Sequence, residues 1–357
     1  MTPDWKETLL MYRLSFFVVL FFSLVGLFLP ANAESISEIF QRINPAVVVI
    51  HTSERVATPQ TETGFTSVAG LGSGFIISEE GHVMTAAHVV QAADAVVVEF
   101  HDGKQIPARV VSSAPEADVS LLMLEKIPSD MVVVKLGDSD KANVGDQAFI
   151  IGAPYGVSHT LTVGYISGRH SPDTRYGGLF AAEMLQTDTA INQGNSGGPM
   201  FNMAGEAIGI VSHIMSQSGG SEGLGFVITS NLARELLLEK KSVWFGLQGH
   251  FLSGEMAKIL NVPPPGVGIL VQKVAAGSPA EALGLQGGTY QVKIQEQEVI
   301  LGGDIILEVM GVSLSESEKV RRLLYKLKPG QTLRLSILRG GKTMNIMHQM
   351  TAEELPD

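Results

Sequence analysis

The segment Thr189-Ala-Ile-Asn-Gln-Gly-Asn-Ser-Gly-Gly-Pro199 places one serine, Ser196, among three glycines and ahead of a proline. Glycine lacks a Cβ, so this composition permits a tight turn that exposes the hydroxyl and aims successive N–H groups at one point. An acyl-transfer nucleophile with an oxyanion hole needs both features. The same residues also suit an ordinary surface turn. The role of the segment therefore depends on whether the chain supplies a base and an orienting acid.

A histidine and an aspartate upstream of Ser196 fit these two roles. His88 lies in Thr85-Ala-Ala-His-Val-Val90, and Asp118 lies in Glu116-Ala-Asp-Val-Ser-Leu-Leu122, at the start of an apolar strand. A carboxylate in that place is costly unless a hydrogen-bonding or cationic partner meets it, and an imidazole is such a partner. The alternative for His88 is a half-buried core histidine. In chain order the residues read His, Asp, Ser, the order of chymotrypsin-like proteases and not of subtilisins or α/β-hydrolases.

This order predicts a catalytic triad. Ser196 is expected to attack a carbonyl carbon, His88 to take its proton and return it to the leaving amine, and Asp118 to fix the imidazole tautomer. The N–H groups of Gly194, Asn195 and Ser196 are expected to form the oxyanion hole.

Residues 34–240 read mainly as β-strands. Short β-branched or apolar runs recur, with Gly, Asp and Asn between them: Val47-Val-Val-Ile50, Phe75-Ile-Ile77, Val96-Val-Val98, Arg109-Val-Val111, Leu121-Leu-Met-Leu124, Ala148-Phe-Ile-Ile151 and Ala207-Ile-Gly-Ile-Val211. Such spacing is typical of an all-β barrel or sandwich. With the triad order it predicts a chymotrypsin-like double β-barrel, closed by a helix over residues 230–238 that Ser230 or Asn231 caps.

Several motifs together resemble the HtrA (Deg) family of serine proteases: Thr85-Ala-Ala-His, Ala117-Asp-Val-Ser-Leu-Leu, Gln186-Thr-Asp-Thr-Ala-Ile-Asn-Gln-Gly-Asn-Ser-Gly-Gly-Pro and Gly223-Leu-Gly-Phe-Val-Ile228. The resemblance covers nearly everything after residue 34. The serine motif is highly specific, whereas Val119 and Ser120 depart slightly from the family's usual aspartate motif. The resemblance implies an ATP-independent endoprotease of unfolded or mislocalised proteins that needs no cofactor. It also implies a homotrimer, with Phe40 and its neighbours as the contact.

Residues 241–352 resemble a PDZ domain of the HtrA type, a small α+β fold that follows the barrels. The resemblance implies that N–H groups around Val267, Gly268 and Ile269 hold the C-terminal carboxylate of a peptide, which pairs with the strand that begins at Ile269. A helix over residues 316–326 would form the other wall of the groove through Val320, Leu323 or Leu324. The alternative is an ordinary amphipathic helix on a β core. The piece from 286 to 299 is expected to add a hairpin.

The same resemblance places Ala190 at the base of the specificity pocket, with Ile191 and Leu224 on its walls. None of the three carries a charge, so the expected residue before the cleaved bond is a small or medium aliphatic one. The alternative for Ile191 and Leu224 is plain core packing. Family loops near residues 171–182 sense activation, so Arg169 or Arg175 is a candidate to carry such a signal; from the residues alone each is a solvated surface arginine.

The N-terminus suggests export. Arg13 precedes an almost wholly apolar run over residues 14–29, which Pro30 and Ala31-Asn-Ala33 follow. This pattern predicts a signal peptide over residues 1–33, cleaved before Glu34, and hence a periplasmic protein. An uncleaved membrane anchor is the alternative, because the run is only slightly shorter than a spanning helix needs. Met11 is an alternative start to Met1.

Composition excludes several classes of function. The chain has no cysteine, which excludes disulfides, thiol catalysis and cysteine-based metal sites, and its nine histidines show no paired metal-ligand spacing, so no metal is expected. Residues 1–240 carry 13 Lys and Arg against 25 Asp and Glu, so no basic surface is available for nucleic acid. The function class that competes with the enzyme is a non-catalytic holdase or peptide-binding protein on the same scaffold.

Overall fold

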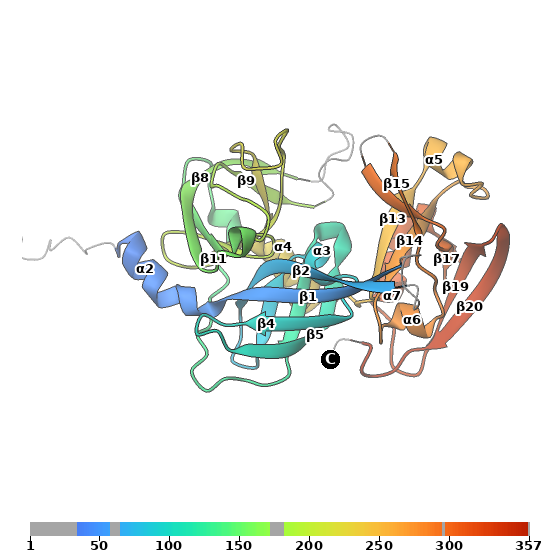
Figure 1. Cartoon of the computed structure of the whole chain (residues 1–357), viewed down its shortest axis with the longest axis horizontal. Helices are drawn as coiled ribbons and strands as arrows, with labels where there is room; N and C mark the ends of the chain where they lie inside the picture. The colour runs from blue at the N-terminus through green and yellow to red at the C-terminus, as the bar shows by residue number, and fades with distance from the viewer. Residues whose placement is uncertain (1–33, 58–64, 172–181, 295–296, 356–357) are drawn as a thin grey trace, which may run out of the picture. The chain divides into compact units, whose positions relative to one another are not determined.

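The computed structural model describes residues 34–57, 65–171, 182–294 and 297–355, and residues 47–229 form two closed six-stranded barrels (Figure 1). The strand order is β1-β2-β3-β6-β5-β4 in the first barrel and β10-β11-β12-β9-β8-β7 in the second. The predicted double barrel is confirmed. The strands of the first barrel are β1 (Val47–Ala57), β2 (Phe65–Ile76), β3 (His82–Thr85), β4 (Ala95–Glu99), β5 (Gln105–Ala114) and β6 (Val119–Leu124). Those of the second are β7 (Gln147–Gly152), β8 (Thr160–His170), β9 (Met184–Thr187), β10 (Pro199–Phe201), β11 (Ala207–Ile214) and β12 (Gly225–Thr229).

The apolar runs form strands because the two faces of each strand pack into two different hydrophobic cores. In β1, Val48 and Ile50 pack into the core of the first barrel, whereas Val47 packs into a second cluster. Side chains alternate across a strand, so a run without polar residues is buried on both faces. Each such burial stabilises the fold by about 1.5–3 kcal/mol. Of the predicted runs, only Ile77 falls outside a strand, one residue past the end of β2.

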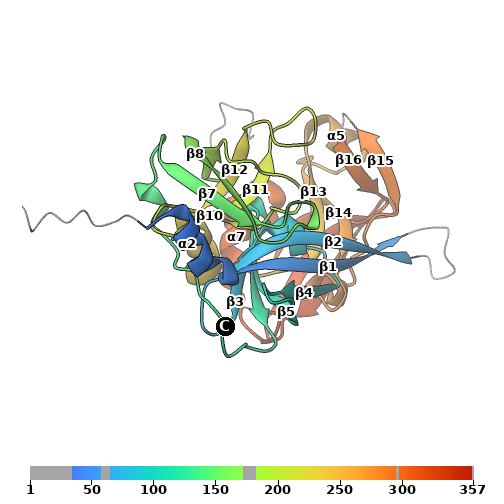
Figure 2. The ribbon, with the colours of Figure 1, turned by 60° about the vertical axis from the view of Figure 1, so that its left-hand side comes forward.

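The second cluster draws on strands of both barrels. Phe75 and Leu121 come from the first barrel, and Phe149 and Phe201 of the second stack with ring centroids 5.3 Å apart. The long β1–β2 hairpin of the first barrel extends away from the barrel strands (Figure 2). The packing of this shared cluster fixes the barrels against each other, which positions side chains from both at one site.

The helices around the barrels are short. They are α2 (Ile36–Ile43), α3 (Ala87–Val90) and α4 (Ser230–Arg234), which continues into the π-helical turn η6 (Glu235–Glu239). The helix predicted over residues 230–238 is therefore confirmed, but its predicted cap is wrong. Thr229 is the N-cap residue, and the Ser230 hydroxyl donates to the Gly137 carbonyl instead.

The second predicted domain is a sheet in the order β13-β14-β17-β19-β20, with β18 beside β17 and a separate hairpin of β15 and β16. Its strands are β13 (Leu247–Leu252), β14 (Gly268–Val274), β15 (Tyr290–Ile294), β16 (Gln297–Leu301), β17 (Ile305–Val309), β18 (Val312–Ser313), β19 (Thr332–Arg339) and β20 (Lys342–Gln349). Its helices are α5 (Gly254–Ile259), α6 (Pro279–Ala282) and α7 (Ser317–Leu324). The predicted hairpin is present as β15 and β16, and the helix predicted over residues 316–326 is α7.

The predicted signal peptide, residues 1–33, lies outside the described residues. Among the helices that the structure does describe, none is long and apolar enough to cross a membrane.

Candidate active site

His88 and Asp118 meet at the edge of the first barrel, as the sequence predicted. His88 lies on α3, and its Nδ1 is 2.9 Å from both carboxylate oxygens of Asp118. The backbone N–H of His88 also donates to Oδ1 of Asp118, at 3.0 Å. Two bonds from one residue to one carboxylate fix the orientation of the ring. About half of the His88 side chain remains exposed, so its outer edge can reach a substrate.

Asp118 sits in a left-handed backbone conformation with φ of 54°, between the turn η2 (Pro115–Ala117) and β6. Aspartate tolerates this region better than most residues because its short polar side chain can bond locally. The Ser212 hydroxyl donates to Oδ2 of Asp118 at 2.5 Å. Ser212 comes from β11 of the second barrel, so the carboxylate receives donors from both barrels.

The pair shifts both pKa values in the directions that a triad needs. Burial by itself lowers the pKa of His88, but the hydrogen bond and negative charge of Asp118 outweigh it and raise that pKa above its ordinary value. Burial by itself raises the pKa of Asp118, but the hydrogen bond and charge of His88, with the Ser212 hydroxyl, lower it below its ordinary value. Asp118 therefore stays ionised and favours a protonated His88.

Ser196 lies in a turn that only glycines can form. Gly194 has φ of 100°, and a Cβ there would lie 2.1 Å from the Ala153 carbonyl oxygen. Gly197 has φ of 84°, and a Cβ there would lie 2.2 Å from Oγ1 of Thr85. Any larger residue at either position would have to push the backbone of the turn away from its neighbours.

Ser73, on β2 of the first barrel, holds this turn in place. Its N–H donates to the Ser196 carbonyl at 2.8 Å, and its hydroxyl donates to the Gly194 carbonyl at 2.7 Å. The same hydroxyl accepts from the N–H of Ala153 at 3.0 Å. The nucleophile segment of the second barrel is thus fixed by a residue of the first.

The Ser196 hydroxyl lies beside the pair without a bond to the imidazole. It donates to the Ser212 carbonyl at 3.5 Å, and no hydrogen bond joins it to His88 within the described part of the chain. Bonds between nucleophile and base are often long before substrate binds. The structure therefore joins His88 to Asp118 directly and connects Ser196 to them through Ser212.

Two of the three predicted oxyanion donors are free. The Gln193 carbonyl accepts from the N–H of Tyr155 at 2.7 Å. Because the C=O and N–H of a trans peptide point in opposite directions, the Gly194 N–H is aimed away from Tyr155. Neither Gly194 nor Ser196 donates its N–H to another described residue. The prediction for the third donor, Asn195, is wrong. Its N–H donates to the Asn192 carbonyl at 3.0 Å and is therefore not available to an oxyanion.

The three residues predicted for the specificity pocket differ in exposure. Ala190 and Leu224 are exposed, the latter by 41%, whereas Ile191 is 3% exposed and belongs to the core of the second barrel. For Ile191 the packing role is thus observed. A specificity role for the three stays a prediction.

The second domain contains a groove of about 540 Å³ between β13 and α7. Leu247, Gly249 and Phe251 line it from the strand, and Val320 and Leu324 from the helix, whereas Leu323 does not. Gln91 and Glu116 of the first barrel border the same groove.

The predicted carboxylate-binding residues Val267, Gly268 and Ile269 need correction. Gly268 and Ile269 lie on β14, which pairs with β13 on one side and β17 on the other, and Val267 directly precedes it. A strand with two neighbours has no edge to offer a peptide. β13 and β20 are the two edge strands of this sheet, and of the two only β13 borders the groove, so a peptide bound there can pair with β13.

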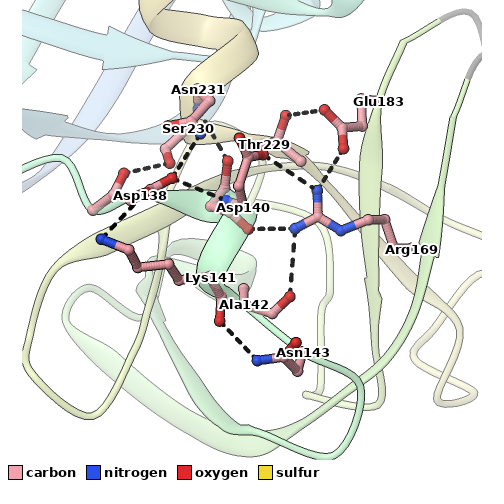
Figure 3. A network of polar contacts seen from close by, with 12 residues as sticks. Asp138, Asp140, Lys141, Ala142, Asn143, Arg169, Glu183, Thr229, Ser230 and Asn231 are labelled. Atoms are coloured by element: carbon pink, nitrogen blue, oxygen red, sulfur yellow. Dashed lines mark hydrogen bonds and ion pairs between the residues drawn. The ribbon is translucent and has the colours of Figure 1, made fainter.

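Arg169 is engaged in a polar network, so its interpretation as a solvated surface arginine is wrong (Figure 3). From the end of β8 its guanidinium donates to Glu183 at 2.5 Å and to the carbonyl oxygens of Ser139 and Ala142. The arginine thereby joins β8 to the turn η3 (Ser139–Lys141) and to the residue that precedes β9. Arg175 lies outside the described residues.

The chain matches two known domain families and is similar to several known proteins. The model of the trypsin-like peptidase domain matches residues 72–210, and that of the PDZ domain matches residues 230–347. The chain is 32% identical to a probable periplasmic serine endoprotease DegP-like of Marinomonas sp. (strain MWYL1), over 92% of this chain and 73% of that one. It is 37% identical to a protein of the same name from Pseudomonas putida (strain GB-1), over 80% of this chain but only 57% of the relative.

Solved structures give the same result. The HtrA-type protease AlgW with tripeptide superposes with a TM-score of 0.51 at 32% identity, over 89% of this chain and 97% of that one. The same protease with decapeptide gives a TM-score of 0.51 at 30% identity, over 89% of this chain and 98% of that one.

Two residues that the site uses, Ser73 and Ser212, are not among those predicted from the sequence. Ser212 directly follows the apolar run that ends at Val211, and a hydroxyl next to a buried apolar run is a recognisable signal. Ser73 lies in a Gly-Ser-Gly context that also describes an ordinary loop, so the sequence gives no comparable signal for it.

Proposed function

Since this chain belongs to the HtrA (DegP-like) family of trypsin-like serine endoproteases, we propose that it cleaves unfolded or mislocalised polypeptides through Ser196, His88 and Asp118. The observation that carries the proposal is the ionised Asp118 bonded to His88, beside a serine whose turn leaves two N–H groups free.

Each residue has one role in the proposed reaction. His88 accepts the proton of Ser196 through Nε2 as Oγ attacks the scissile carbonyl carbon. The N–H groups of Gly194 and Ser196 bind the oxyanion that forms, and each such donor typically lowers the barrier by about 3–4 kcal/mol. His88 then protonates the leaving amine, and a water molecule repeats the sequence to release the acyl group. Asp118 stabilises the imidazolium in both halves.

Family membership supports the wider context of the proposal. We assign residues 34–240 to the protease domain and 241–352 to the PDZ domain, and we place the protein in the periplasm, as the relatives' names do. We also propose that the chain forms a homotrimer. Phe40 is half-buried against the chain's own core, so its free surface is limited. The mass of residues 34–357 in sedimentation equilibrium tests the trimer.

Digestion of casein by residues 34–357, with mass spectrometry of the products, tests the proposed activity. Ala190, Ile191 and Leu224 offer no charge to a substrate side chain, so most cuts are expected after Val, Ala, Ile or Leu. A fluorophosphonate probe is expected to label the peptide that contains Ser196 and no other. Cuts mainly after Lys, Arg or Asp would contradict the specificity. Failure of the probe to label Ser196 would favour the non-catalytic holdase.

The pH dependence of activity follows from the raised pKa of His88. The imidazole must be neutral to accept a proton, so kcat/KM is expected to fall as pH falls through that pKa. The acid limb should therefore lie above about pH 6.5, the ordinary value for histidine. Stopped-time peptide cleavage from pH 5 to 9 measures it, with circular dichroism at each pH to show that the chain stays folded. A limb near pH 5 would contradict the assignment of His88 as the base.

In the second domain, we propose that β13 and α7 bind a C-terminal peptide in the groove between them. Leu324→Ala is expected to weaken binding of a peptide with an apolar C-terminus about tenfold, because one side chain's apolar contact is worth about 1.5–3 kcal/mol when fully buried. Leu323→Ala, one residue away on the same helix but outside the groove, is the matched control and should leave binding unchanged. Fluorescence anisotropy of a labelled peptide measures both. Equal losses in the two variants would place the peptide elsewhere.

A further inference from the structure

His213 lies beside the residue that bonds to Asp118. β11 and β12 pair Val211 with Val227 and His213 with Phe226, so the strand carries a bulge at Ser212. A bulge turns a side chain out of the regular alternation, and here it aims the Ser212 hydroxyl at Asp118. Nδ1 of His213 is 3.1 Å from the same Ser212 oxygen. The His213 ring stacks on Phe226 with centroids 5.1 Å apart and planes 19° apart.

The direction of each bond in this chain follows from counting protons. The carboxylate of Asp118 is ionised and can only accept. The single proton of the Ser212 hydroxyl therefore lies on the 2.5 Å bond to Asp118. The Ser212 oxygen can then only accept from His213, so Nδ1 of His213 must carry a hydrogen.

We propose that His213 is a positioning residue of the triad, which donates from Nδ1 to Ser212 and thereby holds the Ser212 hydroxyl on Asp118. Three hydrogen bonds then form a chain that ends at the Asp118 carboxylate. His213 donates to Ser212, Ser212 donates to Asp118, and His88 donates to the same carboxylate. A hydroxyl that accepts one hydrogen bond donates a stronger one. His213 thus limits the negative charge that Asp118 offers to His88, and it keeps Ser212 from rotating away.

The charges around His213 keep the ring neutral where the triad works. Burial lowers the pKa of His213; the negative charge of Asp118 raises it and the positive charge of His88 lowers it, and the pKa ends below its ordinary value. Asp118 and His88 come from the first barrel. On β12 its neighbour is the uncharged Phe226, and beyond that ring lies His170 of β8, 5.9 Å from Phe226. Neutral His213 with hydrogen on Nδ1 still makes the bond to Ser212.

Two substitutions separate the hydrogen bond from packing. His213→Asn places an amide N–H where Nδ1–H stands, and His213→Phe keeps an aromatic ring against Phe226 but removes the donor. The proposal rests on the proposed protease function, so activity is the first readout. His213→Phe is expected to lower kcat/KM about tenfold, mostly in kcat, and to move the acid limb to higher pH, because a weaker bond from Ser212 leaves the charge of the Asp118 carboxylate less offset and so raises the pKa of His88. His213→Asn is expected to stay within about twofold of the original chain with an unmoved limb.

A readout without turnover distinguishes failure of this proposal from failure of the protease function. In the Ser196→Ala background, the deshielded proton between His88 and Asp118 is followed by NMR as pH changes, and its midpoint gives the pKa of His88. The His213→Phe double variant is expected to titrate at higher pH, and the His213→Asn double variant with the parent. Thermal unfolding of each variant shows that it folds. An unmoved midpoint in His213→Phe, or equal behaviour of the two variants, would overturn the proposal.

Discussion

Ser196→Ala is expected to lower kcat for casein or peptide cleavage by about 10⁶-fold, to the level that binding and the oxyanion donors alone support. The reason is chemical, since alanine has no atom to attack the carbonyl. The fold should not change. The Ser196 hydroxyl makes one bond of 3.5 Å, and the contact with Ser73 uses the Ser196 main chain, which alanine keeps. Single-turnover peptide cleavage and thermal unfolding measure the two effects separately.

Ser129→Ala is the control for this variant. Ser129 is an exposed serine outside the three triad segments, so the same atom is removed without loss of activity. If Ser196→Ala retained more than a thousandth of the activity, another residue would be the nucleophile and the assignment would fail.

Asp118→Asn is expected to lower kcat about 10⁴-fold while the chain stays folded. Asparagine tolerates the left-handed conformation with φ of 54° as well as aspartate does. Its amide, however, cannot accept at both ends. Suppose that the amide oxygen keeps the bond from the backbone N–H of His88. The NH₂ group then takes the place of the second carboxylate oxygen, where the Ser212 hydroxyl donates and where Nδ1 of His88 needs an acceptor. The imidazole is then held in the wrong tautomer.

The same variant carries a second expected signature, in its pH dependence. Asp118 raises the pKa of His88 against the effect of burial. Without the carboxylate only burial remains, so the acid limb of the residual activity should move to lower pH. Asp130→Asn, at an exposed carboxylate, is the control and should change neither rate nor limb. An unmoved limb in Asp118→Asn would show that the two side chains are not coupled in solution.

The contact between His88 and Asp118 could be predicted from the sequence because the cost of burying a carboxylate can be read from the residues next to it. A carboxylate at the mouth of a buried strand needs a partner, and the order of the three motifs restricts the choice of fold. The double barrel followed for the same reason, since runs such as 47–50 and 148–151 have no polar face and must be buried on both sides. The catalytic roles stay predictions until the variants are measured.

Three predictions were wrong because they depend on which groups each residue contacts in the folded chain, and the sequence does not show these contacts. The Gly-rich entry to β14 has the composition of a carboxylate-binding turn, but the sequence does not say that β14 has neighbours on both sides and β13 has one. Composition also cannot show which N–H groups of a turn already donate within the chain, and the Asn195 N–H is one that does. The sequence does not indicate the burial of Arg169, because two of its three acceptors, the carbonyls of Ser139 and Ala142, are main-chain atoms of no particular residue type.

The hold of Ser73 on the nucleophile turn has a consequence for synthesis of the chain. Ser73 and Gly194 are 121 residues apart, and the turn gains its bonds to Ser73 only when both barrels have folded and docked. A chain still leaving the ribosome or the export channel has the histidine and the aspartate but not a shaped nucleophile. Partly made copies of this protein would therefore be unable to cut each other or their neighbours until both barrels have folded and docked.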